Sequence, residues 1–184
     1  MKNPIAAIET TRGKIEIELY PQKAPNTVRS FIRLAQQGLF DGREIRRIVP
    51  GFVIQPSYSH FDDPRGEVAL AGEYALNGFE NTVPFRQGTV AMGGTDKVAS
   101  GSCFFITLSD EAGKKLDGRF AAFGQVISGW EEVERLEHVP LVPVTEPGMP
   151  EGVRVNVPVT PEKMLKVTVE TWGETYPEPE YLSE

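Results

Sequence analysis

The amino-acid sequence has little of what disulfide-bonded folds and metal centres require. Its 184 residues include one cysteine, Cys103, and two histidines, His60 and His138. One cysteine cannot form a disulfide within the chain, which suits a reducing compartment, so we expect a cytoplasmic protein. Neither histidine lies near a Cys/His cluster, so we expect no zinc site and no other metal.

Positive charge and long apolar runs are also scarce. The chain carries 19 Lys and Arg residues against 26 Asp and Glu residues, a formal net charge of -7, and has no long basic run. This balance argues against nucleic acid or an anionic membrane as the main partner. Residues 1–9 hold only a short apolar patch, which predicts neither a signal peptide nor a membrane span. The length suits one domain with a sizeable core, and we expect a monomer.

Periodic patterns near the amino terminus predict a strand pair and a helix. Residues 15–19 alternate isoleucine or leucine with glutamate, and Arg12-Gly13 can turn this strand back onto residues 5–10. Pro25 suits the first turn of a helix, and Gly38 suits its end. The apolar residues that recur between them at helical spacing are Val28, Phe31, Ile32, Leu34 and Ala35.

Further short strands are predicted downstream of a long loop. Residues 56–87 are rich in Gly, Asp, Asn and Pro, which is typical of loops with short extended pieces. Apolar runs predict strands at 89–92, 103–108 and 121–127, and alternation predicts a last one at 164–171. Within the third, a glycine at position 124 suggests a bulge or a close approach of two backbones.

A second helix and two irregular segments complete the chain. Ser128 followed by Glu131 resembles a capping box ahead of a short helix. Residues 139–161 hold six prolines and no helical period, which predicts a long surface excursion. Residues 174–184 hold four glutamates and no basic residue, which predicts a mobile acidic tail. We therefore predict one mainly β domain over residues 1–173, built as a closed antiparallel barrel.

One stretch, residues 45–55, places two adjacent arginines inside apolar sequence. Pro50-Gly51 breaks this stretch, so two short extended pieces should meet there. A guanidinium stays charged in a protein and is seldom buried without a partner. Arg46 is expected to be solvated, whereas Arg47 is a candidate site residue because of the segments that follow it in the chain.

Taken in order, several segments resemble the cyclophilins, the peptidyl-prolyl cis-trans isomerases. The resemblance covers residues 5–137, with a closing strand near Val167. It implies an eight-stranded closed antiparallel barrel with a helix capping each end. The segments that carry it are 24–28 (Ala-Pro-Asn-Thr-Val), 40–42 (Phe-Asp-Gly), 47–55, 88–92, 101–106 and 123–126.

The resemblance also implies a set of site residues. The family's catalytic arginine falls at Arg47, which would hold the carbonyl of the substrate proline and direct donors toward its nitrogen. Gln55 would orient Arg47 and contact the peptide, and the backbone of Gly94 would pair with the residue before proline. The side chains that would form the proline pocket and its rim are Phe52, Val53, Cys103, Phe105, Leu116 and Phe120.

The implied reaction needs no cofactor, because rotation about an X-Pro bond involves no nucleophile, metal or nucleotide. Amide resonance sets a barrier of roughly 18–20 kcal/mol. An apolar pocket that grips the ring, with a fixed donor to the prolyl nitrogen, would favour the twisted amide. Lowering the barrier by about 5–7 kcal/mol would give roughly four to five orders of magnitude in rate. The expected partners are proline-containing peptides and unfolded or exposed protein segments.

Several rim positions depart from the family pattern. Cys103 stands where a glutamine is usual, Phe120 where a histidine is usual, and Lys115 where an aromatic residue is usual. Gly93-Gly94-Thr95 replaces Ala-Asn-Ala, and Pro56-Ser57 replaces a glycine pair. We therefore expect weak binding of cyclosporin-like ligands and isomerase activity below the family norm.

Other interpretations stay open at this point. The same pocket could hold proline-containing segments with little turnover, as a chaperone or binding module. A purely structural barrel would pack Arg47 into an internal ion pair, and Phe52, Val53 and Phe105 would then be ordinary core. Cys103 could act as a nucleophile with a distant histidine, although a cysteine in an apolar strand is more often inert.

Overall fold

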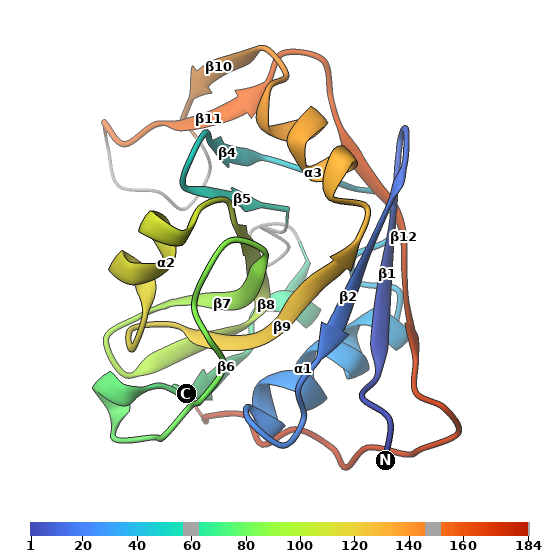
Figure 1. The fold of residues 1–184 in the computed structure, drawn as a ribbon, viewed down its shortest axis with the longest axis vertical. Helices are drawn as coiled ribbons and strands as arrows, with labels where there is room; N and C mark the ends of the chain where they lie inside the picture. The colour runs from blue at the N-terminus through green and yellow to red at the C-terminus, as the bar shows by residue number, and fades with distance from the viewer. Residues whose placement is uncertain (57–62, 146–151, 184) are drawn as a thin grey trace.

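The computed structural model describes residues 1–56, 63–145 and 152–183, and its main element is a strongly curled antiparallel sheet (Figure 1). Ten strands form this sheet, in the order β3-β12-β1-β2-β9-β7-β8-β5-β4 with β6 paired to β8. The strands are β1 Ile5–Thr10, β2 Lys14–Leu19, β3 Arg43–Glu44, β4 Arg47–Val49, β5 Val53–Gln55, β6 Ala69–Ala71, β7 Thr89–Thr95, β8 Val98–Thr107, β9 Ala121–Ser128 and β12 Lys163–Glu170.

The prediction of a mainly β, antiparallel, cyclophilin-like fold is confirmed, whereas closure into an eight-stranded barrel is not. The two ends of the sheet, β3 and β4, are separated along the chain by Ile45 and Arg46 alone. No ladder among the described strands joins β3 to β4. The first and last strands of the sheet are therefore adjacent in sequence, but no backbone pairing between them closes the sheet into a barrel.

The strand pairings follow the sequence pattern. The Arg12-Gly13 turn sets β1 against β2, with Ile8 opposite Ile15, and the isoleucines of β2 are buried as their alternation predicts. At Gly124 a side chain would lie 2.9 Å from the Glu18 carbonyl oxygen, so the predicted close backbone approach is present. The register also shifts in the β7–β9 pairing beside it.

Two of the three helices occur where periodicity predicts them. Helix α1 spans Pro25–Gln36 and lies at one end of the curled sheet in Figure 1, while α3, Trp130–Glu137, lies toward the other. The N-terminus of α1 is capped from a distance: the Glu73 carboxylate accepts hydrogen bonds from the Thr27 amide and hydroxyl at 2.7 and 2.6 Å. The predicted capping box of α3 is wrong, because Gly129 is its N-cap and makes no side-chain bond.

A third helix, α2, spans Asp110–Leu116 and lies outside the prediction of two helices. The Ser109 hydroxyl caps it by accepting a hydrogen bond from the Ala112 amide at 3.1 Å. Its first turn is acidic and its last turn basic, which suits the helix dipole at both ends. The cap and the charge order were visible in the sequence, but seven residues are too few to show a helical period.

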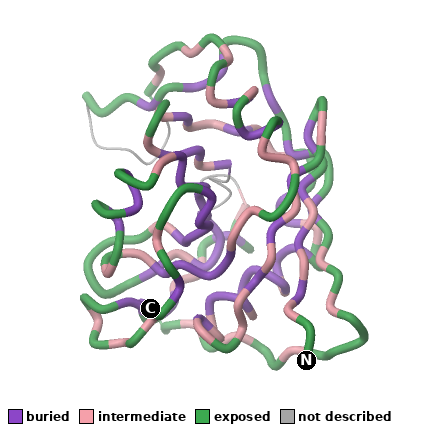
Figure 2. Tube along the Cα trace, viewed as in Figure 1, coloured by how far each residue is buried: buried purple, intermediate pink, exposed green. Residues whose placement is uncertain are grey.

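The larger apolar cluster, here called the inner cluster, lies inside the curl and accounts for most of the buried trace in Figure 2. Four fully buried phenylalanines form its centre, with neighbouring ring centroids 5.3 to 5.5 Å apart. These are Phe31, Phe40, Phe104 and Phe123. Edge-to-face and offset contacts of this kind add to the gain from burying apolar area.

The proline-rich excursion contains regular structure that its composition did not predict. Strands β10, Leu141–Val144, and β11, Val155–Pro158, pair antiparallel as a separate two-stranded sheet. Val155 and Val157 are buried, and β11 lies against β4. Residues 146–151, in the middle of the excursion, lie outside the described part of the chain.

The C-terminal segment, predicted to be a mobile tail, instead packs against α1. Asn26 of α1 exchanges two hydrogen bonds of 2.8 Å with the backbone of Glu180, and Arg33 pairs with Glu178. The Tyr181 hydroxyl lies 3.2 Å from the Ser30 hydroxyl.

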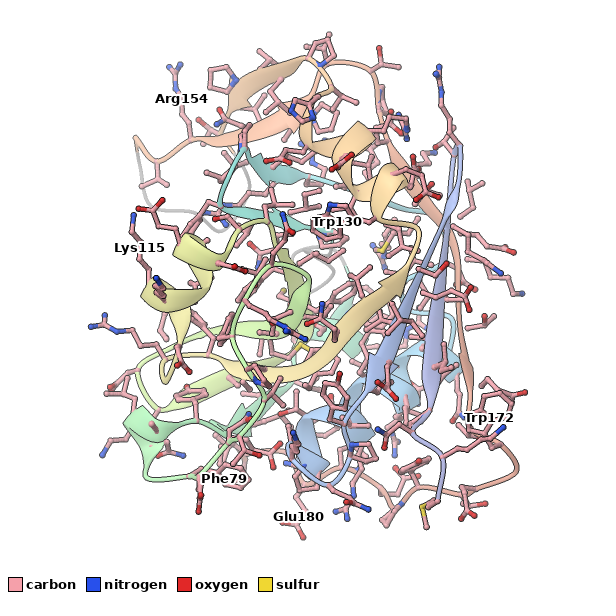
Figure 3. All side chains as sticks on the ribbon, viewed as in Figure 1. Phe79, Lys115, Trp130, Arg154, Trp172 and Glu180 are labelled. Carbon is pink, nitrogen blue, oxygen red and sulfur yellow. The ribbon has the colours of Figure 1, made fainter. Side chains whose placement is uncertain are left out.

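The chain leading into that segment is also held. Trp172, labelled in Figure 3, donates its indole N–H to the Asn3 carbonyl at 3.0 Å, and the Lys2 ammonium lies 4.3 Å from its ring centroid. Such cation–π contacts at exposed sites contribute about 0.5–1 kcal/mol. The amino-acid composition indicated the acidic character of the C-terminal segment but not the contacts of Trp172 and Tyr181 that hold it.

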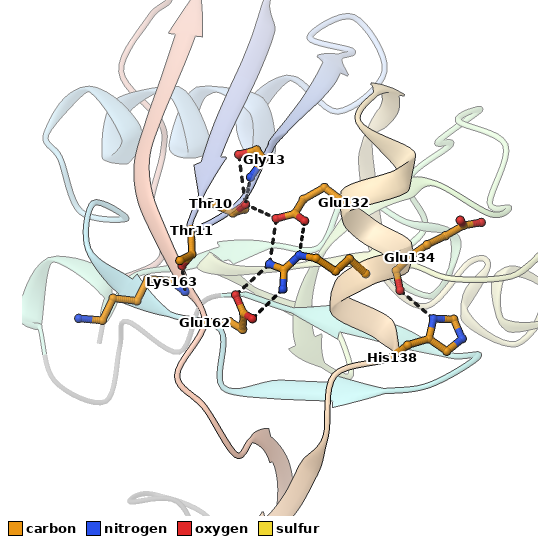
Figure 4. Close-up of polar contacts among 9 residues, drawn as sticks. Thr10, Thr11, Gly13, Glu132, Glu134, His138, Glu162 and Lys163 are labelled. Atoms are coloured by element: carbon orange, nitrogen blue, oxygen red, sulfur yellow. Dashed lines mark hydrogen bonds and ion pairs between the residues drawn. The ribbon is translucent and has the colours of Figure 1, made fainter.

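A buried ion-pair network links α3 to two other parts of the fold (Figure 4). The Arg135 guanidinium donates to Glu132 at 2.5 and 3.1 Å and to Glu162 at 2.8 and 2.9 Å. Glu132 also accepts a hydrogen bond from Thr10 at the end of β1. Burial raises the pKa of Glu132, but the donors Arg135 and Thr10 outweigh burial and hold it below its usual value.

Candidate active site

A second apolar cluster, here called the outer cluster, lies on the face of the sheet opposite the inner cluster. Consecutive residues of one strand serve the two clusters: Phe104 of β8 belongs to the inner one and Phe105 to the outer one. The same alternation occurs in β5, β7 and β9. The outer cluster comprises buried Val53, Val83, Ala91, Phe105, Leu116 and Ala122, with half-buried Tyr20, Val49, Phe52, Phe85 and Phe120 packed against them.

Phe105 is the centre of this cluster. Its ring meets that of Phe120 edge to face at 5.6 Å and lies nearly parallel to that of Phe85 at 6.4 Å. Phe105 itself is 5% exposed, whereas the rings of Phe85 and Phe120 are only half-buried. The cluster is therefore packed at its base and open at its edge, as a site for an apolar ligand group requires.

Arg47 lies at the edge of this surface. It pairs with Gln55 across the β4–β5 hairpin, and its guanidinium donates to the Gln55 side-chain oxygen at 3.4 Å, a long hydrogen bond. Arg47 is half-buried, and its hydrogen-bond partner among the described residues is this amide and not a carboxylate. The neighbouring Arg46 instead forms a 3.0 Å ion pair with Glu44. The internal ion pair of a purely structural barrel is thus not found in the described part of the chain.

Two glycines beside Gln55 account for one departure from the family pattern. A side chain at Gly93 would lie 3.1 Å from the Gln55 amide nitrogen and 3.2 Å from the Cys103 carbonyl oxygen. One at Gly94 would lie 2.8 Å from the Ala99 Cα and would collide with the Val98 carbonyl oxygen. No side chain fits at Gly94 without moving the β7–β8 pairing, so only its backbone is available to a peptide.

The other rim residues differ in exposure. Cys103 is buried, with its thiol 3.8 Å from the Ser102 hydroxyl, so it presents little surface to a ligand or an alkylating reagent. Lys115, labelled in Figure 3, is exposed at the last turn of α2 and projects away from the sheet. Phe120 is half-buried against Phe105. The rim is accordingly apolar at Phe120, and the Lys115 charge lies nearby at the end of α2, directed into solvent.

A small cavity of about 40 Å³ adjoins the outer cluster. Phe120, Val83 and Ala122 of the cluster line one side of it, and Asn81 and Asp117 supply polar groups. Asn81 is fully used: its amide donates to the Glu73 and Ala122 carbonyls at 3.0 and 2.9 Å. The Asn81 amide is therefore held in place by the backbone around the cavity.

Sequence reasoning named five members of the outer cluster and missed six. Val53, Phe105, Leu116, Phe52 and Phe120 were expected from the family pattern, and the structure brings them together. The missed residues come from strands β4, β7 and β9, where only their place on the outer face marks them, and from irregular segments next to β2 and β7. They are Tyr20, Val49, Val83, Phe85, Ala91 and Ala122.

Tyr20 is the titratable member of this set. Burial, and then the negative charge of Glu18, raise the pKa of its hydroxyl above the usual value. Its phenol therefore stays protonated and remains a hydrogen-bond donor at neutral pH. Among the described residues, no three His, Cys, Asp or Glu side chains gather in a way that could hold a metal ion. No helix in the described part of the chain is long and apolar enough to cross a membrane.

A curled antiparallel sheet with an open apolar cluster, and an arginine at the edge of that cluster, fits the cyclophilin resemblance of the sequence. Comparisons with known proteins agree. The family model for cyclophilin type peptidyl-prolyl cis-trans isomerase matches residues 5–168. The chain therefore belongs to the cyclophilin family of peptidyl-prolyl cis-trans isomerases.

Individual relatives give the same result. A peptidyl-prolyl cis-trans isomerase of Acinetobacter baylyi is 32% identical over 178 residues, which cover 93% of this chain and 88% of that protein. A peptidylprolyl isomerase domain and WD repeat-containing protein of Mus musculus is 31% identical over 84% of this chain, but the match spans only 24% of the mouse protein.

A solved structure shows the same fold at lower identity. The crystal structure of a Cryptosporidium parvum cyclophilin type isomerase superposes with a TM-score of 0.74 at 21% identity and covers 92% of this chain and 98% of its own. A second structure of that protein, obtained in the presence of the dipeptide Ala-Pro, superposes with a TM-score of 0.73.

Proposed function

We propose that this chain isomerises X-Pro bonds of peptides and of unfolded or exposed protein segments, through the outer cluster and Arg47. The observation that carries the proposal is the position of Arg47, bound to Gln55 at the edge of an open apolar cluster. The Ala-Pro dipeptide named with the Cryptosporidium parvum structure supports a proline-containing ligand for this fold.

In this mechanism the proline ring packs on Phe105, between the half-buried rings of Phe52 and Phe120. Arg47 holds the proline carbonyl and directs its N–H groups toward the prolyl nitrogen, whose lone pair appears as the amide twists. Gln55 keeps the guanidinium in place, and the Gly94 backbone pairs with the residue before proline. Because the donor matters only in the twisted state, it lowers the barrier and not merely the energy of the bound ground state.

A second candidate is a module that binds proline-containing segments with little turnover. The rebuilt rim favours it: Cys103 is buried, Gly94 lacks space for a side chain, and Lys115 replaces an aromatic group. Each change removes a polar or stacking contact that would hold the peptide on either side of proline. The same changes support the prediction of weak cyclosporin-like binding. The monomeric state and the cytoplasmic location likewise stay predictions.

One experiment separates the two candidates. Two-dimensional exchange NMR on a short X-Pro peptide reports binding through chemical shifts and catalysis through cis-trans cross-peaks in the same sample. Uncatalysed exchange takes on the order of tens of seconds or longer, so cross-peaks at sub-second mixing times require a catalyst. An isomerase gives shifts and cross-peaks with a catalytic amount of protein, whereas a binding module gives shifts alone.

A further inference from the structure

The turn between β4 and β5 is bonded by residues from outside the hairpin. The Phe52 amide donates to the Val49 carbonyl at 2.9 Å, which closes a four-residue turn with Pro50 second and Gly51 third. Gly51 has φ +76°, as the third position of a type II turn requires. A type I turn closes with the same hydrogen bond but with its central peptide rotated, so closure alone does not fix the orientation of the Gly51 N–H.

Residues at the ends of two helices bond the two peptide groups that flank the Gly51 Cα. The Gly51 N–H donates to the carboxylate of Glu137, the last residue of α3, at 2.6 Å. The Gly51 carbonyl accepts a hydrogen bond from the hydroxyl of Ser109, the N-cap of α2, at 2.8 Å. The Leu108 amide donates to the Phe52 carbonyl at 2.9 Å, one residue further on. An N–H bound to a carboxylate is among the stronger backbone hydrogen bonds.

The hairpin needs this support because β4 ends the sheet. It pairs with β5 alone in the ladder, and each of the two strands is three residues long. Arg47 begins β4, and Phe52 directly follows the turn, so a rotated turn would displace both ends of the proposed site. The contact is remote from the reacting bond, since Glu137 bonds backbone and not substrate.

We propose that Glu137 is a positioning residue for isomerisation, which fixes the turn and thereby the placement of Arg47 and Phe52, with Ser109 as its counterpart. This inference rests on the proposed function. Misplacement of a catalytic group by a fraction of an ångström to 1 Å costs about ten- to a hundred-fold in rate. We expect a loss near the lower end when Glu137 is removed, because Ser109 still bonds the carbonyl of the next peptide, Gly51–Phe52.

The test compares Glu137→Ala with Glu134→Ala, which removes an exposed carboxylate one turn earlier on the same helix. Glu137→Ala should lower kcat for an X-Pro peptide about ten-fold, with KM changed about two-fold or less. Glu134→Ala should match wild type in both. In proton NMR the Gly51 amide should shift upfield in Glu137→Ala, since its bond to a carboxylate is lost. Glu137→Gln keeps an acceptor and should recover part of the rate.

A mutant cycle shows whether the effect passes through the arginine. In an Arg47→Lys background, Glu137→Ala should have about two-fold effect or less, because no guanidinium is left to place and only the smaller effect through Phe52 remains. Equal rates for Glu137→Ala and Glu134→Ala, or an undiminished loss in the Arg47→Lys background, would overturn the positioning role. Failure of the proposed function gives a different result, a wild-type protein that does not accelerate exchange at all.

Discussion

The inner and outer clusters are built from alternate residues of the same strands, yet they face different surroundings. In β8, Phe104 is fully buried against Phe31 and Phe40, while the next residue, Phe105, meets half-buried rings at an open edge. Antiparallel sheets usually present a polar face to water. An apolar outer face with a cation at its margin is therefore a feature that the fold alone does not need, and it fits the proposed binding of proline-containing segments.

The two clusters should differ most in how the loss of one aromatic ring affects stability and catalysis. Phe31→Ala leaves a closed cavity in the inner cluster and should lower the free energy of unfolding by about 4 kcal/mol. Phe105→Ala leaves a cavity at an open edge, where neighbours and water can fill it, and should cost about 2 kcal/mol. Urea denaturation measures both values.

Catalysis should rank the same two variants in the opposite order. At a temperature where both are folded, Phe31→Ala should keep the isomerisation rate of wild type per folded molecule. Phe105→Ala should lower kcat/KM about a hundred-fold, since the ring that grips proline is lost. Equal losses of activity in the two variants would mean that the clusters are not separate in function.

The Arg135 network links α3 to Thr10 and Glu162 and is expected to contribute to stability but not to catalysis. Glu132→Gln should lower the free energy of unfolding by about 3 kcal/mol at neutral pH, because it leaves Arg135 with one carboxylate fewer in a buried setting. The folded-state pKa of Glu132 lies below its ordinary value of 4.5, so its stabilisation is complete above that pH and is lost as the pH falls below it.

The gap in stability between wild type and Glu132→Gln should therefore narrow below pH 4.5. Equilibrium denaturation of both proteins at pH 7 and at acid pH measures the difference in their free energies of unfolding at each pH. A gap that stays constant with pH would show that the ionised carboxylate contributes nothing. Isomerase activity per folded molecule should be unchanged, since the network lies away from the outer cluster.

A smaller effect is expected from two glycines with matched geometry. Gly51 and Gly173 both have positive φ, +76° and +80°, and no atom lies within 4 Å of an added Cβ at either. Alanine at each should cost about 1–2 kcal/mol of stability through backbone strain alone. Only Gly51→Ala should also lower the isomerisation rate, because Gly51 lies in the turn that connects β4, which contains Arg47, to β5. Loss of activity in Gly173→Ala would remove this distinction.

The smallest effect is expected at Lys115, which is exposed beside the outer cluster. Lys115→Ala should change the free energy of unfolding by no more than about 0.5 kcal/mol. It should weaken binding of a peptide with a glutamate next to proline about two-fold, and added salt should abolish the difference. Titration at two salt concentrations measures this. A salt-independent loss would mean that the lysine stem packs against the peptide.

The sequence predicted what depends on local pattern. Strand alternation located β1 and β2, Pro-Gly located the β4–β5 turn, and helical spacing located α1. The family pattern located Arg47 and Gln55, which the structure places together at 3.4 Å. These features are decided by neighbours in the chain, so local reasoning reaches them.

Features that depend on remote partners were not predictable in this way. The carboxyl end docks because Tyr181 meets Ser30, and Gly101 leaves the space for it: a side chain there would lie 2.9 Å from the Ser30 hydroxyl. Likewise α1 takes its cap from Glu73, 46 residues away from Thr27. The outer cluster draws Phe85 from an irregular loop. None of these pairings leaves a periodic trace in the sequence.

The most direct test of this account is the rate of cis-trans exchange in an X-Pro peptide bound to Arg47→Ala, compared with wild type at saturating peptide. The account predicts that the variant still binds the peptide through the outer cluster, with lower affinity because the contact to the proline carbonyl is lost. At saturation it should isomerise the peptide about a hundred-fold more slowly or worse, since the fixed donor is gone. An Arg47→Ala protein that binds and isomerises like wild type would contradict the account, and the apolar cluster alone would then have to carry the reaction.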